Sequence, residues 1–173
     1  MIFASVGSIL PFDRLVRAVD EWAAANPGRE VFLQIGEGRY EPRHAPFVRM
    51  MPHDEYRRRL TDCSLFVAHV GMGSILQALE ERKQMLLLAR HHSLGEHTTD
   101  HQLHTAGRFR DVPGLKIVDD TAALQAEMTA LVDHPMQQAT GISPHASQEL
   151  LDNIANFLRP IRTGKPGMVL APR

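Results

Sequence analysis

The stretch that most constrains the fold is residues 65–82, which read LFVAHVGMGSILQALEER. The short apolar run from Leu65 to Ala68 is typical of a buried strand, and a turn with two glycines follows it. Apolar residues then recur at helical spacing, which predicts a helix with Ser74 as its N-cap. This order places free backbone N–H groups and the positive end of a helix dipole beside the turn. The pattern therefore predicts a site for a phosphate-bearing ligand.

Strand and helix patterns alternate along most of the chain. Strands are expected over residues 2–6, 31–35, 47–51, 65–68, 85–89 and 115–118. Helices are expected over residues 12–25, 52–60, 74–82, 98–108, 121–132 and from Ser143 to about residue 159. Such alternation predicts an α/β fold, a Rossmann-like parallel sheet with helices on both faces. Ligands bind beyond the carboxyl ends of such strands, where the loops at Gly7, Gly36, Gly71 and Arg90 would meet.

Composition excludes several classes of protein. The chain has 173 residues, 43% of them hydrophobic, so we expect one domain over residues 1–160 and an irregular tail over residues 161–173. A net charge of −1 argues against a nucleic-acid partner. Cys63 is the only cysteine, which excludes an internal disulfide and fits a reducing compartment. The N-terminal stretch does not resemble a signal peptide, and the apolar runs are too short to span a membrane.

A second polar cluster follows the strand expected near residue 89. Arg90 opens this histidine-rich loop and is a candidate to meet a phosphate. His97 and His101 stand four residues apart, a spacing that zinc ligands can have, but no HExxH pattern accompanies them. We therefore expect no metal site, and a solvated surface is the alternative interpretation for any single histidine of this loop.

Four motifs in order along the chain resemble the C-terminal domain of glycosyltransferase family 28. They are VGS-x-x-PFDRL at residues 6–15, QIG at 34–36, HVGMGSILQAL at 69–79 and LGEHTTDHQ at 94–102. The chain is most similar to the stand-alone members of the family. These include the bacterial PssE-type proteins of exopolysaccharide biosynthesis and the small subunit of the UDP-N-acetylglucosamine transferase of N-glycan assembly. Four motifs at matching spacing are more specific than a single glycine turn.

The resemblance implies one half of a GT-B glycosyltransferase, the half that binds the sugar-nucleotide donor. The other half would be a membrane-associated acceptor-binding subunit, and activity would need this heteromeric complex. The implied reaction is inverting transfer from a UDP-sugar to a lipid-linked saccharide in surface polysaccharide synthesis. This chain would be cytoplasmic and peripheral to the membrane, with no cofactor and with the catalytic base on the partner. The alternative is a non-catalytic nucleotide-sugar-binding or scaffolding subunit of such a complex.

The resemblance also implies roles for particular residues. Backbone N–H groups of Gly71, Gly73 and Ser74 would receive the diphosphate, and Asp100 and Gln102 would face the donor sugar. The first loop would lie on the cleft that faces the partner domain. The complete set of candidate donor-binding residues is Gly7, Ser8, His69, Gly71, Gly73, Ser74, Gln77, Arg90, Glu96, His97, Asp100 and Gln102.

Gln77 departs from the family pattern. Family members usually have glutamate at this position, where the carboxylate holds the ribose hydroxyls. Glutamine has a single acceptor oxygen and two donor hydrogens, so it would bond ribose less strongly. In an alternative interpretation, Ser74 and Gln77 form a capping box, in which Gln77 folds back to the helix start.

The last expected helix, residues 144–159, carries an apolar stripe that permits two interpretations. The stripe packs on the domain, or it helps to dock the partner chain. The second follows from the resemblance, because the C-terminal helix of two-domain relatives reaches across to the other half.

Overall fold

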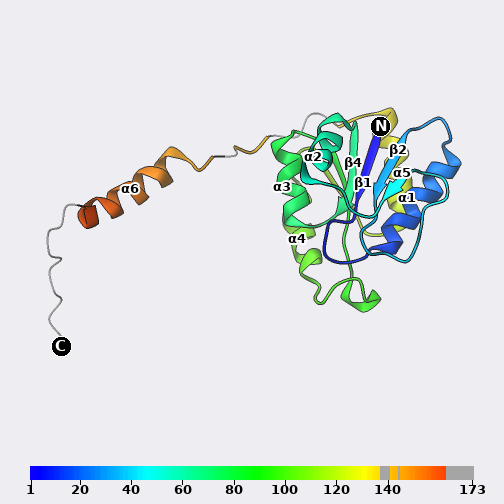
Figure 1. The fold of residues 1–173 in the computed structure, drawn as a ribbon, viewed down its shortest axis with the longest axis horizontal. Helices are drawn as coiled ribbons and strands as arrows, with labels where there is room; N and C mark the ends of the chain where they lie inside the picture. Colours follow the sequence, from blue (N-terminus) through cyan, green and yellow to red (C-terminus); the bar gives the residue numbers. More distant parts are fainter. Residues whose placement is uncertain (137–140, 144, 163–173) are drawn as a thin grey trace. The chain divides into compact units, whose positions relative to one another are not determined.

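A computed structural model describes residues 1–136, 141–143 and 145–162 of the chain. It divides the chain into two compact units, Met1–Ile142 and the residues from Ser143 onward, and each is described by itself. The first unit, called the body here, is a six-stranded parallel sheet with helices on both faces (Figure 1). This confirms the expected α/β, Rossmann-like fold.

The strands lie close to the expected positions and are all parallel. They are β1 (Ile2–Ser5), β2 (Val31–Gln34), β3 (Phe47–Val48), β4 (Leu65–His69), β5 (Met85–Leu88) and β6 (Leu115–Val118). Their order in the sheet is β3-β2-β1-β4-β5-β6, so the direction of winding reverses between β1 and β4. β3 is shorter than expected because its partner β2 ends at a turn, where Gly36 has a φ of +58°. The reversal defines the crevice in which such sheets bind ligands.

Five helices of the body cover the two faces of the sheet. Helices α1 (Asp13–Ala25) and α5 (Thr121–Asp133) pack on one face, and α2 (His53–Asp62), α3 (Met72–Glu80) and α4 (His101–Phe109) pack on the other (Figure 1). The central strands are apolar except near their carboxyl ends, where β1 has Ser5 and β4 has His69, because both of their faces are buried. In β4, for example, Leu65 and Val67 belong to one core cluster and Phe66 and Ala68 to the other.

Two helix starts differ from the prediction. α3 begins at Met72 with Gly71 as its N-cap, so the expectation that Ser74 caps this helix was wrong. Gly71 has extended backbone (φ −106°, ψ 133°), which lets the chain enter the helix directly from the turn. α4 begins at His101 rather than at Thr98, because a short 3-10 turn, η1 (His92–Leu94), and an irregular segment precede it.

In the described part of the second unit the chain forms the helix α6 (Gln148–Arg162), which starts later than expected. The N–H of Leu150 donates to the Ser147 hydroxyl oxygen at 3.3 Å, so Ser147 provides the cap. Apolar residues at helical spacing give the helix an amphipathic pattern, as the sequence indicated. Pro144 and the part of the expected tail over residues 163–173 lie outside the described residues. Among the residues that the structure covers, no helix has the length and apolar character to cross a membrane.

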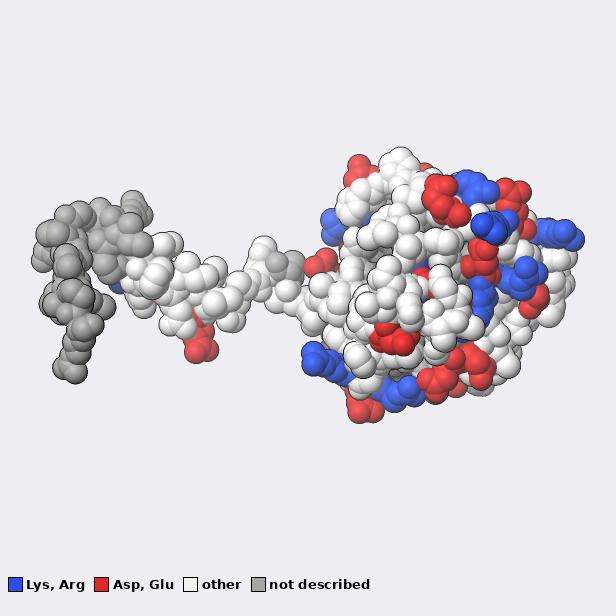
Figure 2. Space-filling view, turned by 90° about the horizontal axis from the view of Figure 1, so that it is seen from below, with Lys and Arg blue, Asp and Glu red and all other residues white. Residues whose placement is uncertain are grey.

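The charges of the body are mixed. Figure 2 shows lysine and arginine side chains interspersed with aspartate and glutamate over the face turned to the viewer. Ion pairs account for part of this mixture, such as Arg29 with Asp133 and Arg57 with Glu81. This pattern agrees with the net charge of −1.

A buried carboxylate fixes the segment between β2 and β3. Asp20 of α1 is fully buried and accepts hydrogen bonds from the Tyr40 hydroxyl and from the backbone N–H groups of Arg43, His44 and Ala45. Burial opposes ionisation and raises the pKa of Asp20, but these hydrogen bonds outweigh it, so the pKa lies below its ordinary value. The carboxylate is therefore ionised and satisfied inside the body.

The substitution Asp20→Asn should lower the free energy of unfolding by about 2 kcal/mol or more. The asparagine amide keeps one acceptor oxygen, but its NH₂ group would face a backbone N–H of residues 43–45, and two donors cannot bond each other. Urea unfolding measures the change. Glu21→Gln, at an exposed position next along α1, serves as the control and should change stability little. Equal effects of the two substitutions would contradict this account of Asp20.

Candidate functional site

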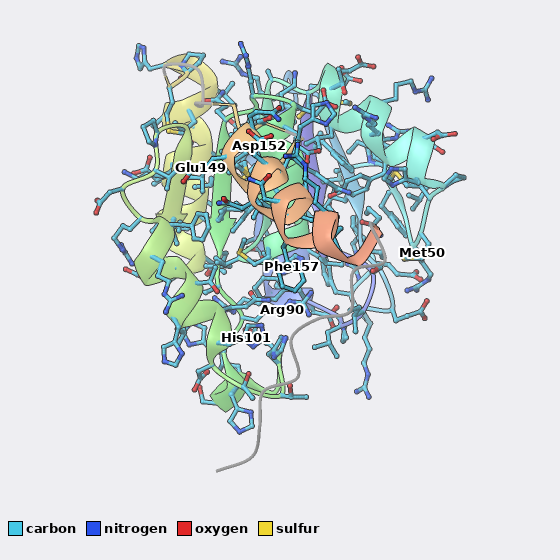
Figure 3. The ribbon with its side chains drawn as sticks, turned by 90° about the vertical axis from the view of Figure 1, so that its left-hand side faces the viewer. Met50, Arg90, His101, Glu149, Asp152 and Phe157 are labelled. Atoms are coloured by element: carbon cyan, nitrogen blue, oxygen red, sulfur yellow. The ribbon has the colours of Figure 1, made fainter. Side chains whose placement is uncertain are left out.

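Two adjoining cavities lie at the carboxyl ends of the strands, where β1 and β4 meet. The histidine cavity, about 300 Å³, is lined among others by His69, Arg90, His97, His101 and Gln102. The methionine cavity, about 320 Å³, is lined by Gln34, Met50, Met51, His53, Tyr56 and Gln77. Both cavities share Gly7, Ser8 and Gly73. Figure 3 labels Arg90 and His101 for the first cavity and Met50 for the second. The site thus occupies the predicted crevice.

The glycines around His69 are needed to accommodate its ring. A Cβ on Gly7 would lie 2.7 Å from His69 Nε2, and Gly7 has a φ of +77°. A Cβ on Gly71 would overlap the same ring. Gly73 differs, because a Cβ there would meet nothing within 4 Å. Gly7 and Gly71 therefore make room for a side chain, whereas the backbone at Gly73 is open to a ligand.

The first turn of α3 supplies part of the predicted anion site. The first helical hydrogen bond runs from the Ile75 N–H to the Gly71 carbonyl, so the N–H groups of Met72, Gly73 and Ser74 precede the helical ladder. The N–H of Gly71 donates to the His69 carbonyl at 2.8 Å. The expectation that Gly71 offers its N–H to a diphosphate was therefore wrong.

His69 is neutral and hydrogen-bonded at both ring nitrogens. Gln102 Nε2 lies 3.1 Å from its Nδ1, and Ser74 Oγ lies 3.4 Å from its Nε2. Burial, together with the nearby Arg90 cation, lowers the pKa of His69 to about 4. At neutral pH the imidazole is thus an uncharged part of the cavity wall.

This pKa predicts an acid-sensitive stability. The unfolded chain binds a proton at His69 near pH 6.5, but the folded chain does so only near pH 4, so acid favours unfolding across this interval. Relative to His69→Asn, the wild type should lose up to about 3 kcal/mol of unfolding free energy as pH falls from 6.5 to 4. Urea unfolding at several pH values measures it. His134→Asn is the control, and a wild-type slope equal to that of His69→Asn would contradict the prediction.

Arg90 is a buried cation that holds the loop after β1. Its side chain is 2% exposed, and its Nη2 donates to the carbonyls of Val6 at 2.6 Å and Leu10 at 2.7 Å. Its guanidinium carbon lies 5.0 Å from the centre of the Phe12 ring. Burial lowers the pKa of Arg90 to about 10, so it stays charged at neutral pH. Nε has no hydrogen-bond partner among the described residues. The structure places Arg90 in the cavity wall, with its strongest contacts inside the protein.

Glu96 is also engaged within the protein. Its carboxylate accepts two hydrogen bonds from Arg14, at 2.7 and 2.8 Å, and one from the His91 N–H at 3.0 Å. Arg14 also donates to the Ala89 carbonyl at 2.9 Å. These bonds tie the loop after β5 to α1. The sequence analysis missed Arg14, since nothing local shows that it pairs with a residue 82 positions away.

Of the remaining loop residues, His97 and His101 line the histidine cavity, whereas Asp100 is exposed and is not part of its lining. The rings of His97 and His101 meet edge to face with 4.3 Å between their centres, and Asp100 accepts a hydrogen bond from the His92 N–H at 2.8 Å. Desolvation, the neighbouring His101 and then Arg90 lower the pKa of His97. Among the described residues, no group of three or more His, Cys, Asp or Glu side chains is arranged to hold a metal ion.

A buried glutamine, Gln34, holds the turn at Gly7, which lines both cavities. The Ser5 hydroxyl donates to Gln34 Oε1 at 2.5 Å and accepts from the Gly7 N–H at 3.1 Å. Gln34 Nε2 donates to the Gly7 carbonyl at 3.2 Å. The positive-φ turn at Gly7 is therefore fixed by side chains of β1 and β2.

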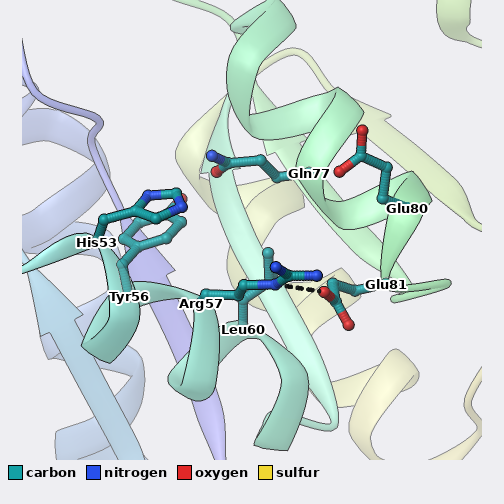
Figure 4. A pocket seen from close by; sticks show the side chains of 7 residues that line it. All are labelled: His53, Tyr56, Arg57, Leu60, Gln77, Glu80 and Glu81. Carbon is teal, nitrogen blue, oxygen red and sulfur yellow. Dashed lines mark hydrogen bonds and ion pairs between the residues drawn. The ribbon is translucent and has the colours of Figure 1, made fainter. Parts of the chain in front are cut away.

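Gln77 is a residue of α3, and its side chain lies on the side of the helix that faces α2. It points toward His53 and Tyr56, and these three residues line both the methionine cavity and a smaller cavity of about 80 Å³ (Figure 4). Its amide makes no hydrogen bond to the described residues, and Ser74 lies inside α3. The capping-box interpretation is therefore wrong, and the amide of Gln77 is available to a ligand.

No motif in the sequence indicated that the site includes His53, Tyr56, Met50 and Met51. Burial raises the pKa of Tyr56, while the nearby hydroxyls of Ser5 and Ser74 lower it, and the net shift is upward. The short apolar run that ends at Met51 gave the only signal, and it indicated a strand rather than a cavity wall.

Comparisons with known proteins show the fold. No protein-family model matches the sequence, and no curated protein matches it either. Among solved structures, the glycotransferase of kitacinnamycin is similar over 94% of this chain, with 18% identity and a TM-score of 0.59. CalG4, the calicheamicin glycosyltransferase, is similar over 92%, with 14% identity and a TM-score of 0.54. The chain spans 39% and 43% of their lengths. It therefore has the fold of one half of a GT-B glycosyltransferase.

One similar structure is nearly coextensive with this chain. The solution structure of ALG13 is similar over 88% of the chain and 93% of its own length, with 16% identity and a TM-score of 0.54. This likeness agrees with the expected resemblance to stand-alone domains of this fold.

Proposed function

We propose that this chain is the donor-binding subunit of a two-chain inverting glycosyltransferase. It would bind a UDP-sugar, and a membrane-associated partner would bind a lipid-linked saccharide acceptor, as in surface polysaccharide synthesis. The observation that carries the proposal is the open backbone at Gly73, which lies at the first turn of α3 and at the junction of both cavities. An anion bound there would meet free N–H groups and the positive end of the helix dipole.

The two cavities suggest how a donor would lie. The diphosphate would sit at Gly73 and Ser74, since both cavities open onto this turn. The nucleoside would extend into the methionine cavity, where the free amide of Gln77 can bond ribose hydroxyls. The sugar would extend into the histidine cavity toward His97, with Asp100 in the same loop as a further candidate contact. No residue of this chain is assigned as the base that deprotonates the acceptor, which the proposal leaves to the partner.

The proposal assigns the acceptor half of the enzyme to a second chain. This chain corresponds to about two fifths of the length of the larger glycosyltransferases whose fold it shares. The amphipathic α6 is proposed to help dock that chain. In this proposal the partner brings the complex to the membrane, and neither α6 nor the body does so.

Gly73 provides a direct test. Gly73→Asp should weaken UDP binding at least about tenfold, because it places a carboxylate where the diphosphate is expected. Gly73→Ala is the matched control, since its Cβ has room and adds no charge. Titration calorimetry with UDP measures both. Similar affinities for the two variants would contradict the proposed phosphate site.

A second experiment separates the donor-binding proposal from the scaffolding alternative. That alternative is favoured by the glutamine, in place of the usual glutamate, at position 77. Gln77→Glu should tighten UDP binding several-fold if the cavity holds ribose, because a carboxylate makes stronger hydrogen bonds to hydroxyls. Calorimetry with UDP, UDP-glucose, UDP-glucuronate and UDP-N-acetylglucosamine identifies the donor. Absence of binding by the wild type and the Gln77→Glu variant, alone and with a co-expressed partner, would favour a scaffold.

A further inference from the structure

Gln102 lines the histidine cavity, and both ends of its side-chain amide are hydrogen-bonded within the body. The residue is only 3% exposed and lies at the start of α4. Its Oε1 accepts from the Arg90 backbone N–H at 3.1 Å, and its Nε2 lies 3.1 Å from His69 Nδ1. These two bonds fix the orientation of the amide.

These contacts determine the direction of each hydrogen bond. A backbone N–H can only donate, so the oxygen of the Gln102 amide must face Arg90 and its NH₂ group must face His69. An NH₂ group can only donate, so Nδ1 of His69 must be the unprotonated acceptor. The neutral ring then carries its proton on Nε2, 3.4 Å from Ser74 Oγ. The chain of bonds thus runs from Arg90 through Gln102 and His69 to Ser74.

We propose that Gln102 is a positioning residue that holds His69 in the Nε2–H tautomer, with this N–H directed to Ser74 and the turn at Gly73. His69 then presents a hydrogen-bond donor at neutral pH without carrying a charge. Because Ser74 Oγ can accept from His69, its own hydroxyl proton can be donated to a ligand oxygen, for which the nearby Tyr56 hydroxyl competes. On the proposed function, on which this part rests, that oxygen belongs to the diphosphate of the donor. Gln102 would thus act on the ligand through His69 and Ser74.

The tautomer can be read directly from the free protein. Long-range ¹H–¹⁵N correlation spectra of ¹⁵N-labelled protein distinguish Nε2–H from Nδ1–H, and His69→Asn identifies the signals of His69 by their loss. We expect the Nε2–H pattern from pH 8 down to about pH 5. The groups that face this ring, besides Gln102 and Ser74, are the Arg90 cation and His97. An Nδ1–H pattern in the wild type would overturn the proposal.

The substitution Gln102→Glu tests whether Gln102 orients His69 or only fills space in the core. The carboxylate keeps the size of the side chain and the bond from the Arg90 N–H, but it turns an acceptor toward Nδ1. His69 should then take the Nδ1–H tautomer or become protonated at pH 7. Gln84→Glu is the matched control, because Gln84 is also a buried glutamine, bonded to Ser64 and Met136. A His69 pattern that is unchanged in Gln102→Glu would overturn the proposal.

UDP affinity tests the consequence for the ligand. Where the spectra show the neutral Nδ1–H tautomer in Gln102→Glu, the affinity for UDP should fall at least about tenfold relative to Gln84→Glu, the effect of one hydrogen bond to a charged group. Where they show a protonated His69, which keeps its Nε2–H, the affinity should not fall. Unchanged affinity, with the tautomer changed, would overturn the link to the ligand. If the wild type binds no UDP alone or with its partner, the proposed donor site fails, while the spectra of the free protein still decide the role of Gln102.

Discussion

The buried guanidinium of Arg90 is the interaction on which the candidate site depends. A cation removed from water is costly unless its donors are satisfied, and Val6 and Leu10 provide carbonyls at short distances. Through these bonds the residue after β5 holds the loop after β1. The two loops belong to strands that are not neighbours in the sheet, since β4 lies between β1 and β5. Arg90 therefore forms part of the wall of the histidine cavity and links the loop after β5 to the loop after β1.

Further side-chain hydrogen bonds hold the other loops of the site in place. Arg14 and Glu96 tie the segment before α4 to α1, and Gln34 fixes the turn at Gly7. Each bond joins segments that are far apart in sequence. Binding a ligand to such preformed walls costs less conformational entropy than ordering free loops would.

The sequence predicted what is local and missed what is long-range. The strand, glycine turn and helix around residue 71 follow from hydrophobic periodicity and glycine chemistry, and the sheet follows from their repetition. The N-cap was misplaced because Gly71 itself takes the extended geometry of a cap. The engagement of the Gly71 N–H, of Glu96 and of Gln102 depends on partners from other elements, which no local pattern reports.

A neutral His69 has a consequence for proton exchange. A cavity whose imidazole titrated near neutral pH would take up a proton when it bound an anion, and the heat of binding would depend on the ionisation of the buffer. The pKa of His69 is about 4, so its imidazole is neutral at neutral pH in the free protein, and an anion must raise this pKa by several units before the ring takes up a proton. The positive potential comes instead from the Arg90 cation and from the dipole of α3, neither of which titrates there. His69 itself thus presents the same uncharged ring from mildly acidic to mildly alkaline solution in the free protein.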